Sequence, residues 1–161
     1  MSFFFLIKIQ IIMVDNIEIT FCEIKYNSEE YRKELQLRDE VLRKPLGMSL
    51  FDENLEGDKN DIHIAAFLKD DLVGILLLKP ISSYELKMRQ VAVLEKYQSK
   101  KIGNQLVLFA EEFAKKSNYR KISLHARKTA LEFYQKLGYY KIFTEFYEVG
   151  IPHYKMFKEL I

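Results

Sequence analysis

A polar, lysine-rich loop is the first place where this sequence could do chemistry. The loop spans residues 95–101, follows a buried strand and opens directly into an amphipathic helix; Lys100 and Lys101 lie at its end. The first N–H groups of a helix have no partner inside it, and the helix dipole is positive there, so such an end binds phosphate readily. Gly103 allows close backbone approach. The pattern indicates a phosphate site, and a merely solvated loop stays open as the alternative.

Two titratable side chains near the C-terminus could accept a proton. Glu148 and His153 flank the segment Gly150-Ile151-Pro152. We expect this segment to interrupt a pair of strands, because proline donates no N–H and glycine tolerates unusual φ values. Irregularities of this kind often re-aim side chains beside active sites. The alternative interpretation is a surface glutamate and a strand-end histidine.

The elements that must position these residues follow from hydrophobic periodicity and turn signals. Ser28 is expected to cap the first helix and Gly138 to end the last one. The acidic segment 52–61 is expected to be a surface loop. The pattern predicts strands at 17–24, 62–68, 72–78, 84–94, 121–125, 139–147 and 153–157, and helices at 28–44, 102–116 and 129–137. The order is therefore β-α-β-β-β-α-β-α-β-β, without a repeat or a linker.

Composition narrows the class of protein. The chain has 161 residues, 48% of them hydrophobic, and a formal net charge of only +2. A nucleic-acid binder usually gathers a larger positive excess on one face, so nucleic acid is not an expected partner. The single Cys22 excludes a disulfide within the chain and fits a reducing, cytoplasmic location. His63, His125 and His153 are scattered, and no metal site is expected.

The first 16 residues are hydrophobic and need a separate interpretation. Residues 3–14 are nearly all apolar but include Lys8 and Gln10, and the run is shorter than the ~20 residues that span a bilayer. It also lacks the flanks of a signal peptide. Three interpretations stay open: an extra N-terminal strand, a hydrophobic tail at a subunit contact in a homodimer, or an upstream start codon with Met13 as the natural start. The single folded domain is predicted over 17–161.

Two stretches of the sequence resemble the GNAT family of N-acetyltransferases. The stretch VAVLEKYQSKKIGNQL at 91–106 resembles the family's acetyl-CoA loop, whose pattern is Gln or Arg, two residues, Gly, one residue, then Gly or Ala. Here the pattern runs from Gln98 to Gly103, with Lys101 in place of the first glycine. The stretch ALEFYQKLGYYK at 130–141 resembles the second conserved block. VLRKPLG (41–47), LHAR (124–127) and EVGIPH (148–153) resemble a bacterial branch of unassigned substrate.

The resemblance implies a binding site for acetyl-CoA as co-substrate. In the family, N–H groups of the loop bind the pyrophosphate, and the preceding strand bonds the pantetheine arm and can also bond the thioester oxygen. If φ of Lys101 is positive, the lysine carries a steric cost on the order of 1 kcal/mol. Arg127 is either a further contact to a CoA phosphate or a charged helix-start residue. The implied backbone contacts are Val91, Ala92, Val93, Gln98, Ser99, Lys100, Lys101, Ile102, Gly103 and Asn104.

The resemblance also gives Tyr134 a role, as the family's tyrosine near the CoA sulfur. A free tyrosine has a pKa of about 10 and a thiol of about 8.5, so a nearby phenol can share or donate a proton as the thiolate leaves. On periodicity alone, Tyr134 is a core residue of its helix. The base does not transfer, because Lys87 occupies the position of the family's strand glutamate. Glu148 and His153 are therefore the candidate bases.

The sequence thus predicts an α+β fold, with a mixed, mostly antiparallel central sheet flanked by helices. The predicted reaction moves an acetyl group from acetyl-CoA to a primary amine by direct attack. The acceptor is a small-molecule or peptide amine of unassigned identity, and the acidic segment 52–61 could attract a cationic one. The alternatives are a CoA-binding sensor or regulator of the same fold without turnover, and a plain interaction module.

Overall fold

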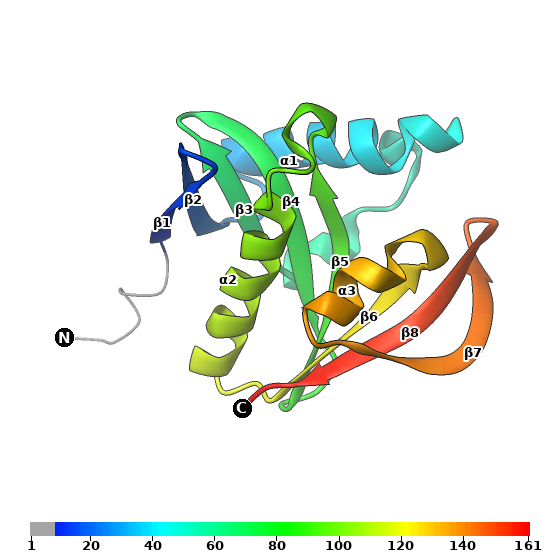
Figure 1. Cartoon of the computed structure of the whole chain (residues 1–161). Coiled ribbons are helices and arrows are strands. Elements are labelled where there is room, and N and C mark those ends of the chain that lie inside the picture. Colours follow the sequence, from blue (N-terminus) through cyan, green and yellow to red (C-terminus); the bar gives the residue numbers. More distant parts are fainter. Residues whose placement is uncertain (1–8) are drawn as a thin grey trace.

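A computed structural model describes residues 9–161 of the chain (Figure 1). The expectations that fall on residues 1–8 lie outside the described part. The strands are β1 (Ile9–Val14), β2 (Ile17–Ile24), β3 (Ile62–Leu68), β4 (Asp71–Pro80), β5 (Glu85–Val93), β6 (Lys121–Arg127), β7 (Tyr140–Glu148) and β8 (Ile151–Glu159). The helices are α1 (Glu29–Leu42), α2 (Ile102–Lys116) and α3 (Leu131–Lys136). The predicted α+β order is confirmed, with β1 added in front.

The strands form one eight-stranded sheet in the order β1-β2-β3-β4-β5-β6-β8-β7. Every neighbouring pair is antiparallel except β5–β6, which α2 joins as a crossover. The β5–β6 pairing runs only from Glu85↔Lys121 to Met88↔Leu124. Because β5 continues to Val93 and β6 to Arg127, the two strands diverge beyond that point (Figure 1). The divergence opens the middle of the sheet beside the start of α2.

The helices cover both faces of the sheet. Ile64, Ala66, Leu76 and Leu78 point to the face that holds α2 and α3, where the larger core cluster lies. Their neighbours in β3 and β4 point to the opposite face, where they pack with Leu37 of α1. This alternation is the period of a strand that is buried on both sides. Within residues 9–161, no helix has the length and apolar run needed to cross a bilayer.

The hydrophobic N-terminal segment supplies an edge strand over the residues that are described. β1 pairs with β2 from Ile9↔Cys22 to Val14↔Ile17. Asp15 and Asn16 between them have φ values of 48° and 64°, as a two-residue hairpin turn requires. Val14 is buried, whereas Ile9, Ile11 and Met13 are exposed. Residues 9–14 thus form the extra strand that was one of the three interpretations, and Met13 lies inside it.

The acidic segment 52–61 lies mostly at the surface, as predicted, but it is folded into turns and buries one of its carboxylates. It contains the end of one 3₁₀ turn (Leu50–Asp52) and the whole of another (Glu56–Asn60), and Asp58 is only 1% exposed. The Asp58 carboxylate accepts hydrogen bonds from Tyr31 Oη at 2.7 Å, Arg38 at 2.7 Å and Arg89 at 2.8 Å. Three donors offset the desolvation of this buried charge and hold the pKa of Asp58 below its usual value, although burial opposes the shift. A carboxylate neutralised in this way cannot draw a cationic amine to the surface.

His63 is charged within the same network. Its Nδ1 lies 2.7 Å from Glu34 Oε1, and its Nε2 lies 2.7 Å from the carbonyl oxygen of Asp58. Glu34 also pairs with Arg38 at 3.1 Å, so it is ionised and only accepts. Both ring nitrogens of His63 therefore carry a proton. Burial alone lowers its pKa, but the hydrogen bond and the charge of Glu34 outweigh burial and raise it.

The predicted break in the last strand pair is wrong. Val149 and Gly150 have φ values of 48° and 74° and form a two-residue turn, after which Glu148↔Ile151 and Tyr147↔Pro152 pair normally. Pro152 lies beyond the last β6 pair, Arg127↔His153, so its missing N–H removes no ladder bond. The irregularity of this sheet edge lies instead in β7, between Lys141 and Glu145.

Candidate active site

A bulge in β5 shapes the floor of the site. Ile75 pairs with Ala92 and Leu77 with Arg89, so Gln90 and Val91 together oppose the single residue Leu76. Gln90 has a φ of 56°, which is an unusual value for a residue with a Cβ. The bulge lies just beyond the point where the pairing of β5 with β6 ends, and β5 stays paired with β4 through Ala92 and Val93. Bulges of this kind are often found beside active sites, where they re-aim backbone groups.

The lysine-rich loop turns sharply through two residues in the left-handed region. Ser99 has a φ of 68° and Lys101 a φ of 62°. Lys101 thus has the conformation for which glycine is suited, and it carries the steric cost that a negative φ would have avoided. Its carbonyl accepts the first helical bond, from Gln105 N at 3.2 Å. Among the described residues, no acceptor is found for the N–H groups of 99–104, so this row of donors can receive an anion.

Below this loop lies a first hollow, which we call the loop pocket. It runs from the end of β5 past the start of α2 to α3. Gln98 helps to fix its rim, because Nε2 donates to the Val93 carbonyl at 2.9 Å. Of the residues predicted to bind a cofactor, Lys100 and Arg127 do not line it. The lining residues are Val91, Ala92, Val93, Tyr97, Gln98, Ser99, Lys101, Ile102, Gly103, Asn104, Ala130, Phe133 and Tyr134.

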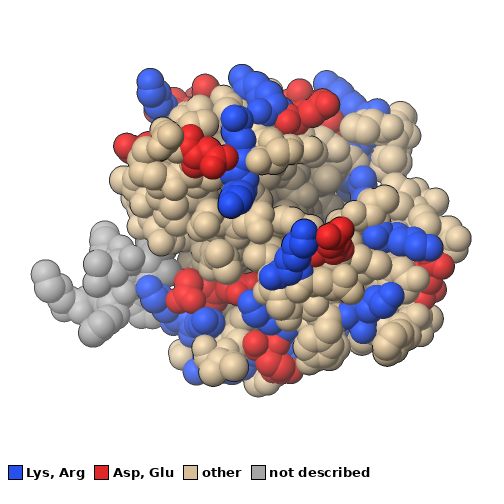
Figure 2. Space-filling view, viewed as in Figure 1, with Lys and Arg blue, Asp and Glu red and all other residues tan. Residues whose placement is uncertain are grey.

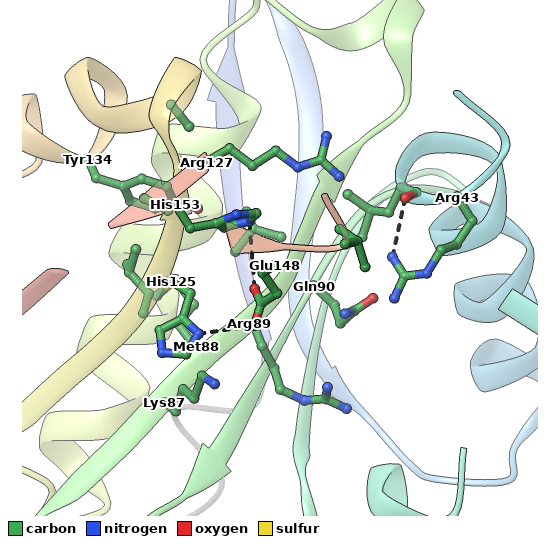
Figure 3. Close-up of a pocket in the computed structure, with 16 residues that line it drawn as sticks. Arg43, Lys87, Met88, Arg89, Gln90, His125, Arg127, Tyr134, Glu148 and His153 are labelled. Carbon is green, nitrogen blue, oxygen red and sulfur yellow. Dashed lines mark hydrogen bonds and ion pairs between the residues drawn. The ribbon is translucent and has the colours of Figure 1, made fainter. Parts of the chain in front are cut away.

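A second hollow, the strand pocket, lies where β5 and β6 diverge and has a volume of about 410 Å³. It is bounded by β5, β6, the β7–β8 hairpin and the C-terminal end of α1 (Figure 3). Figure 2 shows that the face carrying α2 and α3 is hollowed near its centre. The strand pocket is lined by Leu42, Arg43, Lys87, Met88, Arg89, Gln90, Val91, Leu124, His125, Ala126, Arg127, Ala130, Tyr134, Glu148, Val149 and His153.

Tyr134 stands where the two pockets meet. It lines both of them, together with Val91 and Ala130. The residue is 8% exposed, and its ring is held edge-on against Phe133 and Tyr139 at centroid distances of 4.9 Å and 5.9 Å. Within the described chain its hydroxyl has no hydrogen-bond partner. Burial raises the pKa of the phenol, so the group is a protonated donor throughout the physiological range.

His153 lines the strand pocket, and each of its ring nitrogens faces a different acceptor. Its Nδ1 lies 2.7 Å from the Ile151 carbonyl oxygen, which can only accept, so Nδ1 carries a proton in either charge state of the ring. Nε2 lies 3.6 Å from Glu148 Oε2, and in the neutral ring it holds the lone pair. The other oxygen of Glu148 lies 3.2 Å from His125 Nδ1 (Figure 3). Such an imidazole can take up a proton at Nε2, and the carboxylate beside it stabilises the charge that results.

The three predicted catalytic residues, Tyr134, Glu148 and His153, all line the strand pocket. The hairpin turn, not a strand break, places Glu148 beside His153. Sequence reasoning missed Arg89 and Gln90, which line the strand pocket from the bulge. Lys87, noted only as the residue that replaces a family glutamate, also faces this pocket (Figure 3). Burial is the main cause that lowers the pKa of Lys87, and the charge of Glu148 partly offsets it.

Comparison with known proteins agrees with this geometry. The family model described as "Acetyltransferase (GNAT) domain" matches residues 25–160. A putative acetyltransferase of Bacillus subtilis is 28% identical over 138 residues, which are 83% of this chain and 92% of that protein. A putative N-acetyltransferase from Lactobacillus plantarum has a similar structure, with a TM-score of 0.79 at 22% identity over 96% of this chain and 99% of that one.

A third similar structure is a GNAT family acetyltransferase from Elizabethkingia anophelis with acetyl-CoA bound. Its TM-score is 0.66 at 20% identity, over 88% of this chain and 98% of that one. The family match covers most of the chain and includes both pockets. The chain therefore belongs to the GNAT acetyltransferase family. Its class is that of the acyl-CoA-dependent N-acetyltransferases.

Proposed function

We propose that this protein acetylates a primary amine, with acetyl-CoA in the loop pocket and the amine in the strand pocket. One observation carries the proposal: the two pockets share Tyr134, Val91 and Ala130 and nothing else of their linings. Two substrates that enter from opposite sides therefore meet at a single point. A proton donor stands at that point, and a proton acceptor lies on the amine side.

The backbone of the loop supports the placement of the cofactor. The N–H groups of 99–104 suit a pyrophosphate, and Lys101 adds a positive charge at the rim. From there the pantetheine arm runs along Val93, Ala92 and Val91, where β5 has separated from β6. A backbone N–H of the bulge can then reach the thioester oxygen, on which negative charge grows during attack. The proposal therefore uses backbone donors both at the pyrophosphate and at the thioester.

His153 is proposed as the base. The amine nitrogen attacks the thioester carbonyl carbon, the carbon–sulfur bond breaks, and the nitrogen loses a proton to Nε2 of His153, directly or through a water. The bond from Nδ1 to the Ile151 carbonyl holds the ring in the tautomer that this step requires. Glu148 Oε2, at 3.6 Å from Nε2, stabilises the imidazolium that forms.

Tyr134 is proposed as the proton donor to the departing thiolate. Burial raises the pKa of its phenol, so the hydroxyl keeps its proton until the departing thiolate is there to receive it. The proton lost by Tyr134 returns from solvent after the products leave.

Tyr134→Phe and His153→Gln test these roles separately. We expect each to lower kcat by about 10²-fold while the Kd of acetyl-CoA stays within a factor of a few. His153→Gln should also remove the acidic limb of the dependence of kcat/KM on pH, whereas Tyr134→Phe should keep that limb. Tyr97→Phe is a matched control, because it removes a phenol hydroxyl from the loop pocket at a residue that has no proton-transfer role in this proposal. Unchanged turnover in either variant contradicts the role assigned to that residue.

The alternative, a CoA-binding sensor without turnover, makes a different prediction. It requires acetyl-CoA to raise the Tm while no amine is acetylated. Two features favour it: Lys101 replaces the family's loop glycine at a φ of 62°, and Lys87 replaces the family's strand glutamate. The complete pair of Tyr134 and His153 favours the enzyme. A screen of amines that follows thiol release decides between the two.

A further inference from the structure

Two basic side chains face the strand pocket without a carboxylate of their own. Lys87 of β5 and Arg127 of β6 both line it, and neither forms an ion pair or a side-chain hydrogen bond within the described chain. Each is half-buried. In Figure 3, Arg127 extends into the space between Tyr134 and Arg43, and Lys87 approaches from the β5 side. Partly desolvated cations without a counterion are unfavourable unless a ligand brings the opposite charge.

The other basic residues of the pocket have their own counterions. Arg43 pairs with Glu53, from Nε to Oε2 at 2.6 Å. Arg89 pairs with Asp58 at 2.8 Å and with Asp61 at 2.9 Å. The buried network behind Arg89 is balanced, since three carboxylates (Glu34, Asp58 and Asp61) face three cations (Arg38, Arg89 and His63). The excess positive charge of the pocket therefore belongs to Lys87 and Arg127.

Glu148 is the only acidic residue of the lining, and it is already shared. Its two oxygens face His125 at 3.2 Å and His153 at 3.6 Å. The carboxylate also lies close enough to Lys87 to act on its charge. With Glu148 needed beside the base, it cannot neutralise Lys87 and Arg127 as well. The pocket is thus complementary to a ligand that carries negative charge.

We propose that the acceptor is a small amine that also carries an anionic group, a carboxylate or a phosphate, which Lys87 and Arg127 bind. The inference rests on the proposed function and names the substrate class of the same site. Arginine suits such a group because its planar fork matches two oxygens, and lysine adds a point charge. A volume of about 410 Å³ is that of a small-molecule site.

This charge pattern also helps the chemistry. An amine must lose its proton before it attacks, and nearby positive charge disfavours the ammonium form. The anionic group of the same molecule offsets the repulsion between these cations and the substrate. The acceptor is thereby bound through its anion and made nucleophilic at its nitrogen. An acceptor with several positive charges would be repelled by Lys87 and Arg127.

Matched amines with and without the anion test the proposal. The probes are β-alanine against β-alaninamide, and O-phosphoethanolamine against ethanolamine. Thiol release gives kcat/KM, and the Tm of the CoA-loaded protein reports binding without turnover. We expect kcat/KM for the anionic member of at least one pair to exceed that for its neutral partner by 10-fold or more, because the anionic member has the lower KM. Equal or better use of both neutral members overturns the inference while leaving the proposed function intact.

Variants identify the side chains that cause the preference for the anionic amine. Lys87→Gln and Arg127→Gln should each reduce this preference, the ratio of kcat/KM for the anionic amine to that for its neutral partner, by about 10-fold. Lys128→Gln is the control, because it removes a charge from the neighbouring exposed residue, which pairs with Glu145. This variant should leave the preference for the anionic amine unchanged. If Arg127→Gln instead weakens acetyl-CoA binding and keeps the preference, Arg127 belongs to the cofactor and its part in the inference is wrong.

If no amine is acetylated although acetyl-CoA binds, the proposed function fails, and the Tm comparison then decides the inference alone. A larger Tm rise with the anionic members, lost in Lys87→Gln, supports an anion site in a protein without turnover. A rise of the same size with neutral and anionic members, or no rise with either, overturns the inference. The two failures are therefore distinguishable.

Discussion

Asp58→Asn should destabilise the fold strongly, although Asp58 lies in a segment that looks like a surface loop. The carboxylate is 1% exposed, and three donors reach it: Tyr31, Arg38 and Arg89, at 2.7, 2.7 and 2.8 Å. An asparagine offers one oxygen in place of two, so its NH₂ group faces the donor of one arginine. The change also leaves the buried Arg38 with a single carboxylate partner, Glu34.

The expected magnitude follows from these contacts. Removing one partner of a buried ion pair destabilises by about 3–5 kcal/mol. At about 2–4 °C per kcal/mol for a chain of this size, the Tm falls by roughly 6–20 °C. Tyr31→Phe removes only one hydrogen bond to the same carboxylate and should lower the free energy of unfolding by about 1.5–3 kcal/mol.

Calorimetry or a thermal melt at neutral pH measures both variants. Asp52→Asn serves as the control, since this exposed carboxylate of the same segment should change the free energy of unfolding by about 0.5 kcal/mol or less. If Asp58→Asn melts within about 2 °C of the wild-type protein, the buried network does not stabilise the fold as its geometry indicates.

Two further predictions concern His63 and Lys101. The pKa of His63 is raised in the folded state, so its contribution to stability is complete below the unfolded pKa of about 6.5 and is lost as pH rises through the folded pKa. The free energy of unfolding, measured from pH 6 to 8, should show this decline, and His63→Gln should abolish it. A wild-type free energy of unfolding that is flat or rises over that range contradicts the charged His63. Lys101→Gly should be more stable than Lys101→Ala by about 1 kcal/mol, because both variants lose the charge and only glycine tolerates the φ of 62°. Equal Tm values of these two variants would show that the loop is not strained at this position.

Much of the fold was predictable because its signals are local. The alternation of Ile17–Ile24 and the helical spacing of Ile102–Lys116 gave β2 and α2 at their observed bounds. Ser28 caps α1 by accepting from Tyr31 N at 3.2 Å, and Gly138 follows α3 with a φ of 93°, both as predicted. These features depend on a few neighbouring residues, which a single sequence displays.

The rest depends on contacts between distant segments. Pro152 suggested a strand break, but the position of the last β6 pair makes its missing N–H harmless, and nothing local to Pro152 reveals where β6 ends. The burial of Asp58 depends on partners in α1 and β5. One signal did exist: Tyr31, Glu34 and Arg38 share a face of α1 at i, i+3 and i+7, and charged residues on a buried face must have partners.

For the site, residue types were easier to predict than their surroundings. Tyr134 and His153 were named from sequence, but the shared position of Tyr134 between two pockets and the bond that sets the tautomer of His153 are properties of the packed structure. For Arg127 the sequence left two roles open, a contact to a CoA phosphate and a charge at a helix start. Its place in the lining of the strand pocket follows only from the packed structure, in which β6 diverges from β5.

A structure of the complex with acetyl-CoA tests the central claim most directly. The account predicts the pyrophosphate against the N–H groups of 99–104, the thioester carbonyl beside Val91, and the sulfur within hydrogen-bond distance of the Tyr134 hydroxyl. The acetyl group should then face the strand pocket and Nε2 of His153. A thioester that points to solvent, or that lies outside the junction of the two pockets, contradicts the account.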